Sequence, residues 1–296
     1  MATLARAEAE STAFRGAGRA RRLRADSRGL AAFRTIADVD YDRSLSTLIE
    51  SEIIPRLMMA HVAGTPETPA PGIVAEEIAA LAPLALEVEA DALLAHIEKI
   101  LARGVAVDTV MVDLLAPTAR LLGEMWEDDR CDFVDVTMGL WRLQEVVHEI
   151  AARCPADRVL AVGGHRALFA SMPGDQHNFG TVVVDELFRR DGWVTDRLSG
   201  APTPELVKRV GDDWFDLVGL TVSCDAHIAT LTSVIAALRN VSRNPRVCIM
   251  VGGRVFSADP ELAVRVGADG TAGDAKRALA VAGDLLRIRG EEALQA

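Results

Sequence analysis

Aromatic residues are scarce in this chain: they make up 4% of its 296 residues, whereas hydrophobic residues of all kinds make up 50%. Any core must therefore be built mostly from Ala, Val, Leu and Ile. No stretch reaches the roughly 18 consecutive apolar residues that a membrane-spanning helix needs, and the first residues lack the apolar segment of a secretory signal. We therefore expect a protein of the cytoplasm.

Cysteine and positive charge are also in short supply. The four cysteines are too far apart to match a zinc-binding pattern, so we expect free thiols in a reducing compartment. Lys and Arg together number 32 against 43 for Asp and Glu, which gives a formal net charge of -11. This charge argues against sequence-independent nucleic-acid binding by the body of the protein.

The N-terminal segment is an exception to the acidic composition, because its first 35 residues hold eight arginines. It shows little apolar periodicity and is too short for a helix-turn-helix domain with its own core. We interpret residues 1–40 as a basic, mostly disordered arm. The alternative is an arm that makes a weak or indirect contact with DNA, or binds an acidic partner.

A helical pattern follows, and we assign residues 41–154 to a helical bundle. Apolar residues recur at spacings of three and four. Gly104 is a typical helix stop, Asp132 and Asp135 have the spacing of a capping box, and Pro155 marks the domain boundary. The expected helices span residues 44–62, 73–84, 88–103, 107–126 and 133–153.

From residue 157 to 290, strand and helix patterns alternate, which predicts a parallel sheet with helices on both faces. The fold class is therefore α/β plus all-α: a helical bundle followed by a flavodoxin-like, Rossmann-like domain with five strands in the order 2-1-3-4-5. The expected strands are 158–164, 192–199, 215–223, 246–253 and 267–273, and the expected helices are 178–190, 203–210, 226–239, 259–265 and 273–288.

Three loops at the carboxyl ends of these strands hold residues able to bind a ligand. An imidazole with a carboxylate two residues earlier can be a metal ligand oriented by that acid, although a histidine there, taken alone, is more often a turn or structural residue. Paired glycines permit close approach of a bulky or phosphate-bearing ligand. The candidate residues are Asp175, His177, Gly180, Thr221, Ser223, Gly252 and Gly253.

The segment Asp175-Gln176-His177-Asn178-Phe179-Gly180 resembles the D-x-H-x-x-G fingerprint of cobalamin-binding domains. The distances in sequence from Gly180 to Thr221, and from Ser223 to the Gly252-Gly253 pair, are also similar to those of that family. The resemblance departs from the pattern at Thr221-x-Ser223, where the family usually has Ser-x-Leu.

This resemblance implies cobalamin as the cofactor and His177 as the lower axial ligand of its cobalt. It implies that Asp175 holds the imidazole, that Thr221 continues a hydrogen-bond relay, and that the glycine pair makes room for the nucleotide tail. Ser223 would give up an apolar contact with that tail. Heme is a less favoured alternative cofactor.

The bundle resembles the domains that cap the corrin in methyltransferase modules and photoreceptors. Photoreceptor bundles carry a Trp followed after nine residues by Glu-His; here Trp126 is followed by Val136 and Thr137, neither of which can act as the usual upper ligand or acid. Trp126 could cap the corrin or belong to the core. The missing Glu-His favours hydroxo- or aquo-cobalamin over the adenosyl form.

The stretch from Trp126 to Gln144 is similar to the AerR/PpaA group of regulators in photosynthetic proteobacteria and to the sensor domain of AppA. That resemblance implies a non-enzymatic, light- or redox-responsive antirepressor acting on a PpsR/CrtJ-type repressor of photosynthesis genes. The alternative is a corrinoid protein that carries methyl groups on cobalt for methyltransferases. A photoreceptor that binds DNA directly is a third reading, against which stand the acidic charge and the lack of a helix-turn-helix domain.

Overall fold

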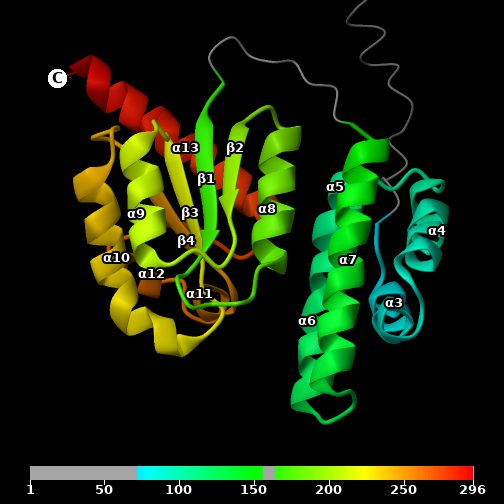
Figure 1. Ribbon diagram of the computed structural model, residues 1–296. Helices are drawn as coiled ribbons and strands as arrows, with labels where there is room; N and C mark the ends of the chain where they lie inside the picture. Colours follow the sequence, from blue (N-terminus) through cyan, green and yellow to red (C-terminus); the bar gives the residue numbers. More distant parts are fainter. Residues whose placement is uncertain (1–71, 156–163, 296) are drawn as a thin grey trace, which may run out of the picture. The chain divides into compact units, whose positions relative to one another are not determined.

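A computed structural model describes residues 72–155 and 164–295 of the chain, all of which belong to the compact unit that begins at Pro69 (Figure 1). The basic arm and the helix expected at 44–62 lie outside the described residues, as do the boundaries expected at residues 41 and 157 and all but the last residue of the strand expected at 158–164. No helix within the two described ranges is long and apolar enough to cross a membrane.

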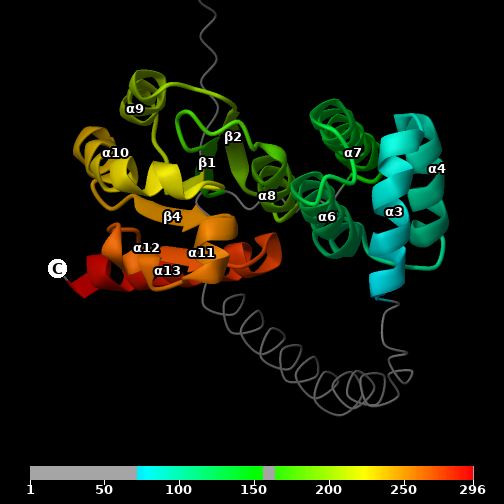
Figure 2. The same ribbon diagram turned by 90° about the horizontal axis from the view of Figure 1, so that it is seen from below.

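The expected bundle is confirmed, and α7 packs against α3, α4 and α6 within it (Figure 2). Its core consists mainly of aliphatic side chains, as the shortage of aromatics predicts. The elements are α3 (Ala75–Glu87), α4 (Ala90–Leu101), α5 (Val107–Thr109), a π-helical segment (Val110–Leu115), α6 (Ala116–Glu127) and α7 (Phe133–Arg153).

The start of α7 follows from its capping box. The Asp132 carboxylate accepts a hydrogen bond from the backbone N–H of Asp135 at 2.8 Å, and the Asp135 carboxylate accepts one from Asp132 N–H at 3.1 Å. These bonds satisfy donors that the first helical turn leaves without partners. The helix ends at Arg153, two residues before Pro155.

The segment expected at 107–126 as one helix contains a widened turn. Pro117 has no N–H to donate to the carbonyl of Asp113, and its ring would crowd that carbonyl in a regular helix. The helix widens here, and Ala116 N–H instead bonds the carbonyl of Met111, five residues earlier. Most of the side chains of this π-helical segment are buried in the bundle core.

The α/β domain has the predicted parallel sheet, with the confirmed strand order β2-β1-β3-β4-β5. The strand that precedes the Asp175 loop begins at Arg166, after the expected strand at 158–164, of which only the last residue is described. The buried apolar residues of the observed strand lie between β2 and β3, so both edges of the strand are hydrogen-bonded. The strands are β1 (Arg166–Ser171), β2 (Val194–Leu198), β3 (Leu217–Thr221), β4 (Cys248–Gly252) and β5 (Gly270–Ala272).

Helices cover both faces of the sheet, as Figure 2 shows. Helices α8 and α13 pack on one face and α9 and α10 on the other, while α8 also contributes Val182, Val183 and Leu187 to the bundle core. The short α11 was not predicted. The helices are α8 (Phe179–Arg190), α9 (Thr203–Asp212), α10 (Ile228–Val241), α11 (Arg254–Ala258), α12 (Leu262–Arg265) and α13 (Ala275–Gln295).

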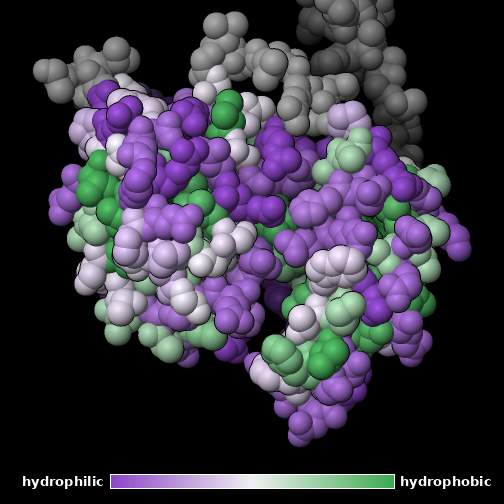
Figure 3. Space-filling model, in the orientation of Figure 1, coloured by the Kyte–Doolittle hydropathy of each residue, from purple (hydrophilic) through white to green (hydrophobic). Residues whose placement is uncertain are grey.

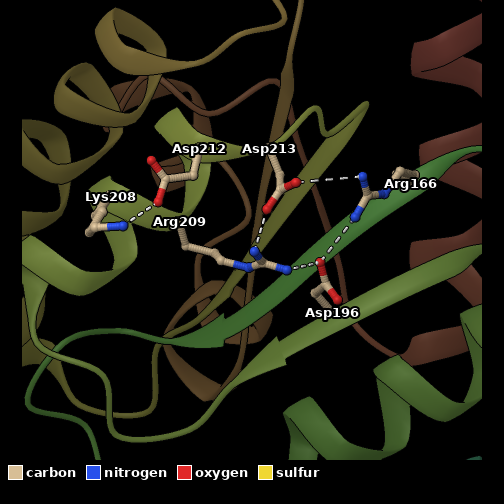
Figure 4. Close-up of polar contacts among 6 residues, drawn as sticks. All are labelled: Arg166, Asp196, Lys208, Arg209, Asp212 and Asp213. Carbon is tan, nitrogen blue, oxygen red and sulfur yellow. Dashed lines mark hydrogen bonds and ion pairs between the residues drawn. The ribbon is translucent and has the colours of Figure 1, made fainter. Parts of the chain in front are cut away.

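An ion-pair network joins β1, β2 and α9 near the amino end of the sheet (Figure 4). Asp196 pairs with Arg209 at 2.7 Å and with Arg166 at 3.4 Å, and Asp213 pairs with both arginines. Both guanidinium groups also lie over the ring of Phe215, at 5.3 and 5.8 Å from its centroid. The network stabilises the end of the sheet opposite to the candidate site.

Candidate cofactor site

The loop after β1 begins with a tight turn over Met172-Pro173-Gly174-Asp175. The N–H of Asp175 donates to the carbonyl of Met172 at 2.8 Å, and Gly174 has a φ of 91°. Proline in the second position and a positive-φ glycine in the third are features of a type II turn. This turn directs Asp175 inward, where the residue is only 3% exposed.

Asp175 connects two loops through its carboxylate. One oxygen accepts the N–H of His177 at 3.0 Å and lies 2.7 Å from Nδ1 of the His177 ring, while the other accepts the N–H of Ser223 at 2.7 Å. Burial alone would raise the pKa of this carboxyl, but the hydrogen bonds from His177 and Ser223 outweigh it and hold the pKa below its ordinary value. Asp175 is therefore an ionised acceptor.

The geometry determines which nitrogen of His177 is available. Because an ionised carboxylate can only accept, Nδ1 carries the proton that it donates to Asp175. In the neutral imidazole the lone pair then lies on Nε2, on a side chain that is 61% exposed. An imidazole whose other nitrogen is held by a carboxylate is the usual form of a histidine metal ligand.

The predicted relay from Asp175 through Thr221 has a different form in the structure. The Thr221 hydroxyl lies 2.8 Å from that of Thr181, which is 3.4 Å from Ser171 Oγ, and Ser171 donates to the carbonyl of His177 at 3.1 Å. Thr221 points to the face of the sheet that α8 covers, whereas Asp175 reaches beyond the strand ends to a backbone N–H. The backbone N–H of Ser223, and not the hydroxyl of Thr221, is therefore the group from β3's loop that bonds Asp175.

Thr181 was missed by the sequence analysis, although the residue is completely buried and joins Ser171 to Thr221. A usable signal was its place directly after Gly180, in the first turn of the helix that follows the loop. A hydroxyl there can reach the sheet, because a helix that starts at the sheet edge brings its first turn back over the strand ends.

A row of small residues crosses the carboxyl edge of the sheet on the same face. Ser171 pairs with Thr221, Thr221 with Gly252, and Gly252 with Ala272. A Cβ placed on Gly252 would have the Ala272 carbonyl oxygen, at 3.8 Å, as its nearest neighbour, and one on Gly180 would have no neighbour within 4 Å. Gly252 and Gly180 therefore leave open space at this edge, whereas Ser171 is buried against Thr181.

Gly253 has a different role from the one predicted. Its φ is 107°, and a Cβ on it would lie 2.3 Å from the carbonyl oxygen of Val222. The second glycine of the pair is thus required by the close approach of the β3 and β4 backbones, whereas Gly252 leaves room for a ligand.

The three candidate residues of the bundle do not share one environment. Val136 is 6% exposed and packs in the bundle core, so its side chain points away from any surface site. The hydroxyl of Thr137 donates to the carbonyl of Phe133 at 2.7 Å. Trp126 is 47% exposed, and its ring lies edge-on to that of Phe133 at 6.3 Å. Trp126 and Thr137 are therefore exposed, whereas Val136 is not.

Sequence analysis also missed the apolar surface around Trp126, which we call the α6–α7 apolar surface. Figure 3 shows hydrophobic residues exposed where α6 and α7 meet. The residues recur at helical spacing along α7, but on the face opposite its core, so periodicity alone did not separate them from buried positions. They are Trp126, Phe133, Val134, Met138 and Trp141.

Comparison with known proteins identifies the α/β domain. Residues 165–282 match a family model described as a B12 binding domain. The chain is 30% identical over 166 residues to a Rhodobacter capsulatus protein named "Uncharacterized 20.5 kDa protein in bchF-crtJ intergenic region"; the match covers 56% of this chain and 85% of that protein.

The fold is similar to that of the monomethylamine corrinoid protein of Methanosarcina barkeri. The superposition has a TM-score of 0.56 and covers 72% of this chain and 98% of that chain. At 16% identity, this likeness shows a shared fold, consisting of a helical part and a Rossmann-like domain.

Proposed function

Since the chain belongs to the same family as the Rhodobacter capsulatus protein and contains a B12-binding domain, we propose that it is a cobalamin-binding regulator of transcription. In this proposal it is a non-enzymatic antirepressor of the AerR/PpaA type. It responds to light or redox state through the cofactor and acts on a PpsR/CrtJ-type repressor.

The observation that carries the cofactor assignment is the Asp175–His177 pair. Cobalamin, when bound, would supply a cobalt ion able to take a nitrogen ligand from the protein. His177 offers one exposed nitrogen oriented by a buried carboxylate, as one axial position requires. At the same edge of the sheet, the open space beside Gly252 and Gly180 would accommodate the nucleotide tail.

In this proposal the α6–α7 apolar surface covers the other face of the corrin. Its aromatic rings are exposed in a protein that is only 4% aromatic, and a flat apolar ligand would shield them from water. Val136 is buried and the Thr137 hydroxyl is bonded to a carbonyl, so neither would ligate the upper axial position. This arrangement favours the hydroxo or aquo form.

A regulatory role is preferred to methyl transfer because of the relative's gene position. The name of the Rhodobacter capsulatus protein places it between bchF and crtJ, and CrtJ is the repressor with which the AerR/PpaA resemblance connects this chain. A methyl-carrying corrinoid protein is the second candidate, supported by the fold shared with the Methanosarcina protein. In the regulator, the basic arm would add a weak or indirect contact with DNA.

The cofactor assignment is tested by absorption spectra of the purified full-length protein mixed with hydroxo-, methyl- or adenosylcobalamin. We expect retention of hydroxocobalamin through gel filtration, and a changed spectrum or lost retention in His177→Ala. His96→Ala, in the bundle, is the matched control and should behave as wild type. Retention of none of the three corrinoids, or binding of heme through His177 instead, would contradict the assignment.

The regulatory assignment is tested by co-purification with a PpsR/CrtJ-type repressor, comparing cofactor-loaded and cofactor-free protein in darkness and after illumination. A regulator should bind the repressor to a different extent in the two states and relieve its binding to DNA. Equal binding in all states, together with methyl transfer to the bound corrinoid by a corrinoid methyltransferase, would instead favour the methyl carrier.

A further inference from the structure

A second histidine lies at the carboxyl edge of the sheet. His227 is the last residue of a short 3-10 turn, Asp225–His227, between β3 and α10, and its side chain is half-buried. Its N–H donates to the carbonyl of Cys224 at 3.2 Å, and its carbonyl accepts the Thr230 hydroxyl at 3.1 Å. The backbone of His227 is thus held at the start of α10.

The ring of His227 lies against Gly174, the positive-φ residue of the turn that precedes His177. A Cβ placed on Gly174 would be 3.4 Å from Cε1 of His227 and 4.0 Å from its Nδ1, so the ring stands on the side of the turn that a larger residue's side chain would occupy. Across the described part of the chain, no hydrogen bond involves the ring nitrogens of His227. The ring is therefore beside the turn without being hydrogen-bonded to it.

The two loops are consequently joined at two points. The Ser223 N–H donates to Asp175, and four residues later His227 packs on Gly174. Gly174 precedes Asp175 directly, and Asp175 sets the position of the His177 ring. A shift of the turn would move the carboxylate and with it the imidazole.

We propose that His227 is a positioning residue for the cobalt site: by packing on Gly174, its ring holds the 172–175 turn in the form that orients Asp175 and His177. This role rests on the proposed function, because it concerns the histidine that would bind cobalt. The contact itself needs no cofactor. Its effect on the turn can therefore be measured with and without cobalamin.

The first test uses hydrogen exchange in the cofactor-free, full-length protein. The amides of His177 and Ser223, both bonded to Asp175, should exchange about fivefold or more faster in His227→Ala than in wild type. His227→Phe, which keeps a ring over Gly174, should restore slow exchange. Unchanged exchange in His227→Ala, or no restoration by phenylalanine, would overturn the proposal.

The second test uses hydroxocobalamin bound to nitrogen-15-labelled protein and then reduced to the paramagnetic cobalt(II) state. A protein nitrogen-15 ligand splits the electron-spin resonance lines into doublets, whereas the cofactor's own nitrogen-14 base would give triplets. We expect doublets in wild type and His227→Phe, a smaller doublet fraction in His227→Ala, and none in His177→Ala.

The outcomes separate the two proposals. A wild-type doublet fraction in His227→Ala would overturn the role of His227 and leave the proposed function intact. Wild-type protein that binds no hydroxocobalamin would overturn the proposed function and, with it, a positioning role at a cobalt site. The exchange experiment would then still decide whether His227 holds the turn.

Discussion

The buried carboxylate of Asp175 meets donors on both of its oxygens. Replacing it with Asn exchanges one oxygen for an NH₂ group, which would face an N–H donor. We expect Asp175→Asn to weaken hydroxocobalamin binding by about 10- to 100-fold, the range typical of groups that orient a metal ligand. Titration by absorbance measures the effect. Asp191→Asn, exposed at the end of α8, should bind as wild type, and equal binding by both variants would contradict the role of Asp175.

Asp175 also predicts a pH dependence of stability. Hydrogen bonds from His177 and Ser223 outweigh the effect of burial and hold the pKa of Asp175 below its ordinary value of 3.8. A group whose pKa is lower in the folded state adds stability above the unfolded pKa and loses it as the pH falls through the folded pKa. The difference in unfolding free energy between wild type and Asp175→Asn should therefore shrink as the pH falls below 3.8. Chemical denaturation at a series of pH values measures it, and a constant difference would contradict the assignment.

Gly252 and Gly253 form a matched pair of test sites. Gly253→Ala should destabilise the protein by at least about 2 kcal/mol, because the backbone is strained and the new Cβ meets the Val222 carbonyl. Gly252→Ala should change stability by less than about 0.5 kcal/mol. It should nevertheless weaken cobalamin binding by about tenfold, because the methyl group enters the ligand space. Chemical denaturation measures the effect of each variant on stability, and absorbance titration measures its effect on binding. A large loss of stability in Gly252→Ala with little loss in Gly253→Ala would contradict these roles.

At the scale of single elements, α7 depends on its N-terminal cap. Asp132→Ala removes the acceptor for Asp135 N–H and should lower the unfolding free energy by about 1 kcal/mol. Asp128→Ala, also exposed and four residues earlier, serves as the control and should lower it by less than about 0.5 kcal/mol. Urea denaturation followed by circular dichroism provides the measurement, and equal losses would argue against the capping box.

The elements differed in how well local patterns predicted them. The helices of the bundle followed from the spacing of apolar residues and from caps such as Asp132, because these signals lie within a few residues of one another. The position of β1 did not follow, since 166–171 is a short apolar run whose strand state depends on pairing with β2 and β3, which are distant in sequence. The exposed face of α7 was likewise hidden, because Trp141 is apolar but lies opposite the core.

At the scale of the whole molecule, a cofactor that binds only the folded state must stabilise it. Hydroxocobalamin at about 100 times its Kd should add about 2.7 kcal/mol to the unfolding free energy. Thermal denaturation should therefore show a higher Tm for the loaded protein and a fall on removal of the cofactor. His177→Ala should show a much smaller rise at the same concentration. A Tm of wild type that does not respond to hydroxocobalamin would contradict the proposed function.

Residue types and spacings were enough to determine the fold class and the strand order, and to predict that Asp175, His177 and the glycine pair lie at one edge, because they follow strands whose carboxyl ends meet there. Tertiary structure alone decided how these residues are connected. It placed the Ser223 N–H, rather than the Thr221 hydroxyl, on Asp175, brought Thr181 between Ser171 and Thr221, and gave the two glycines different roles. The reason is physical: spacing along the chain determines which residues share an edge, whereas hydrogen bonds of about 3 Å depend on side-chain directions that only the packed strands and helices set.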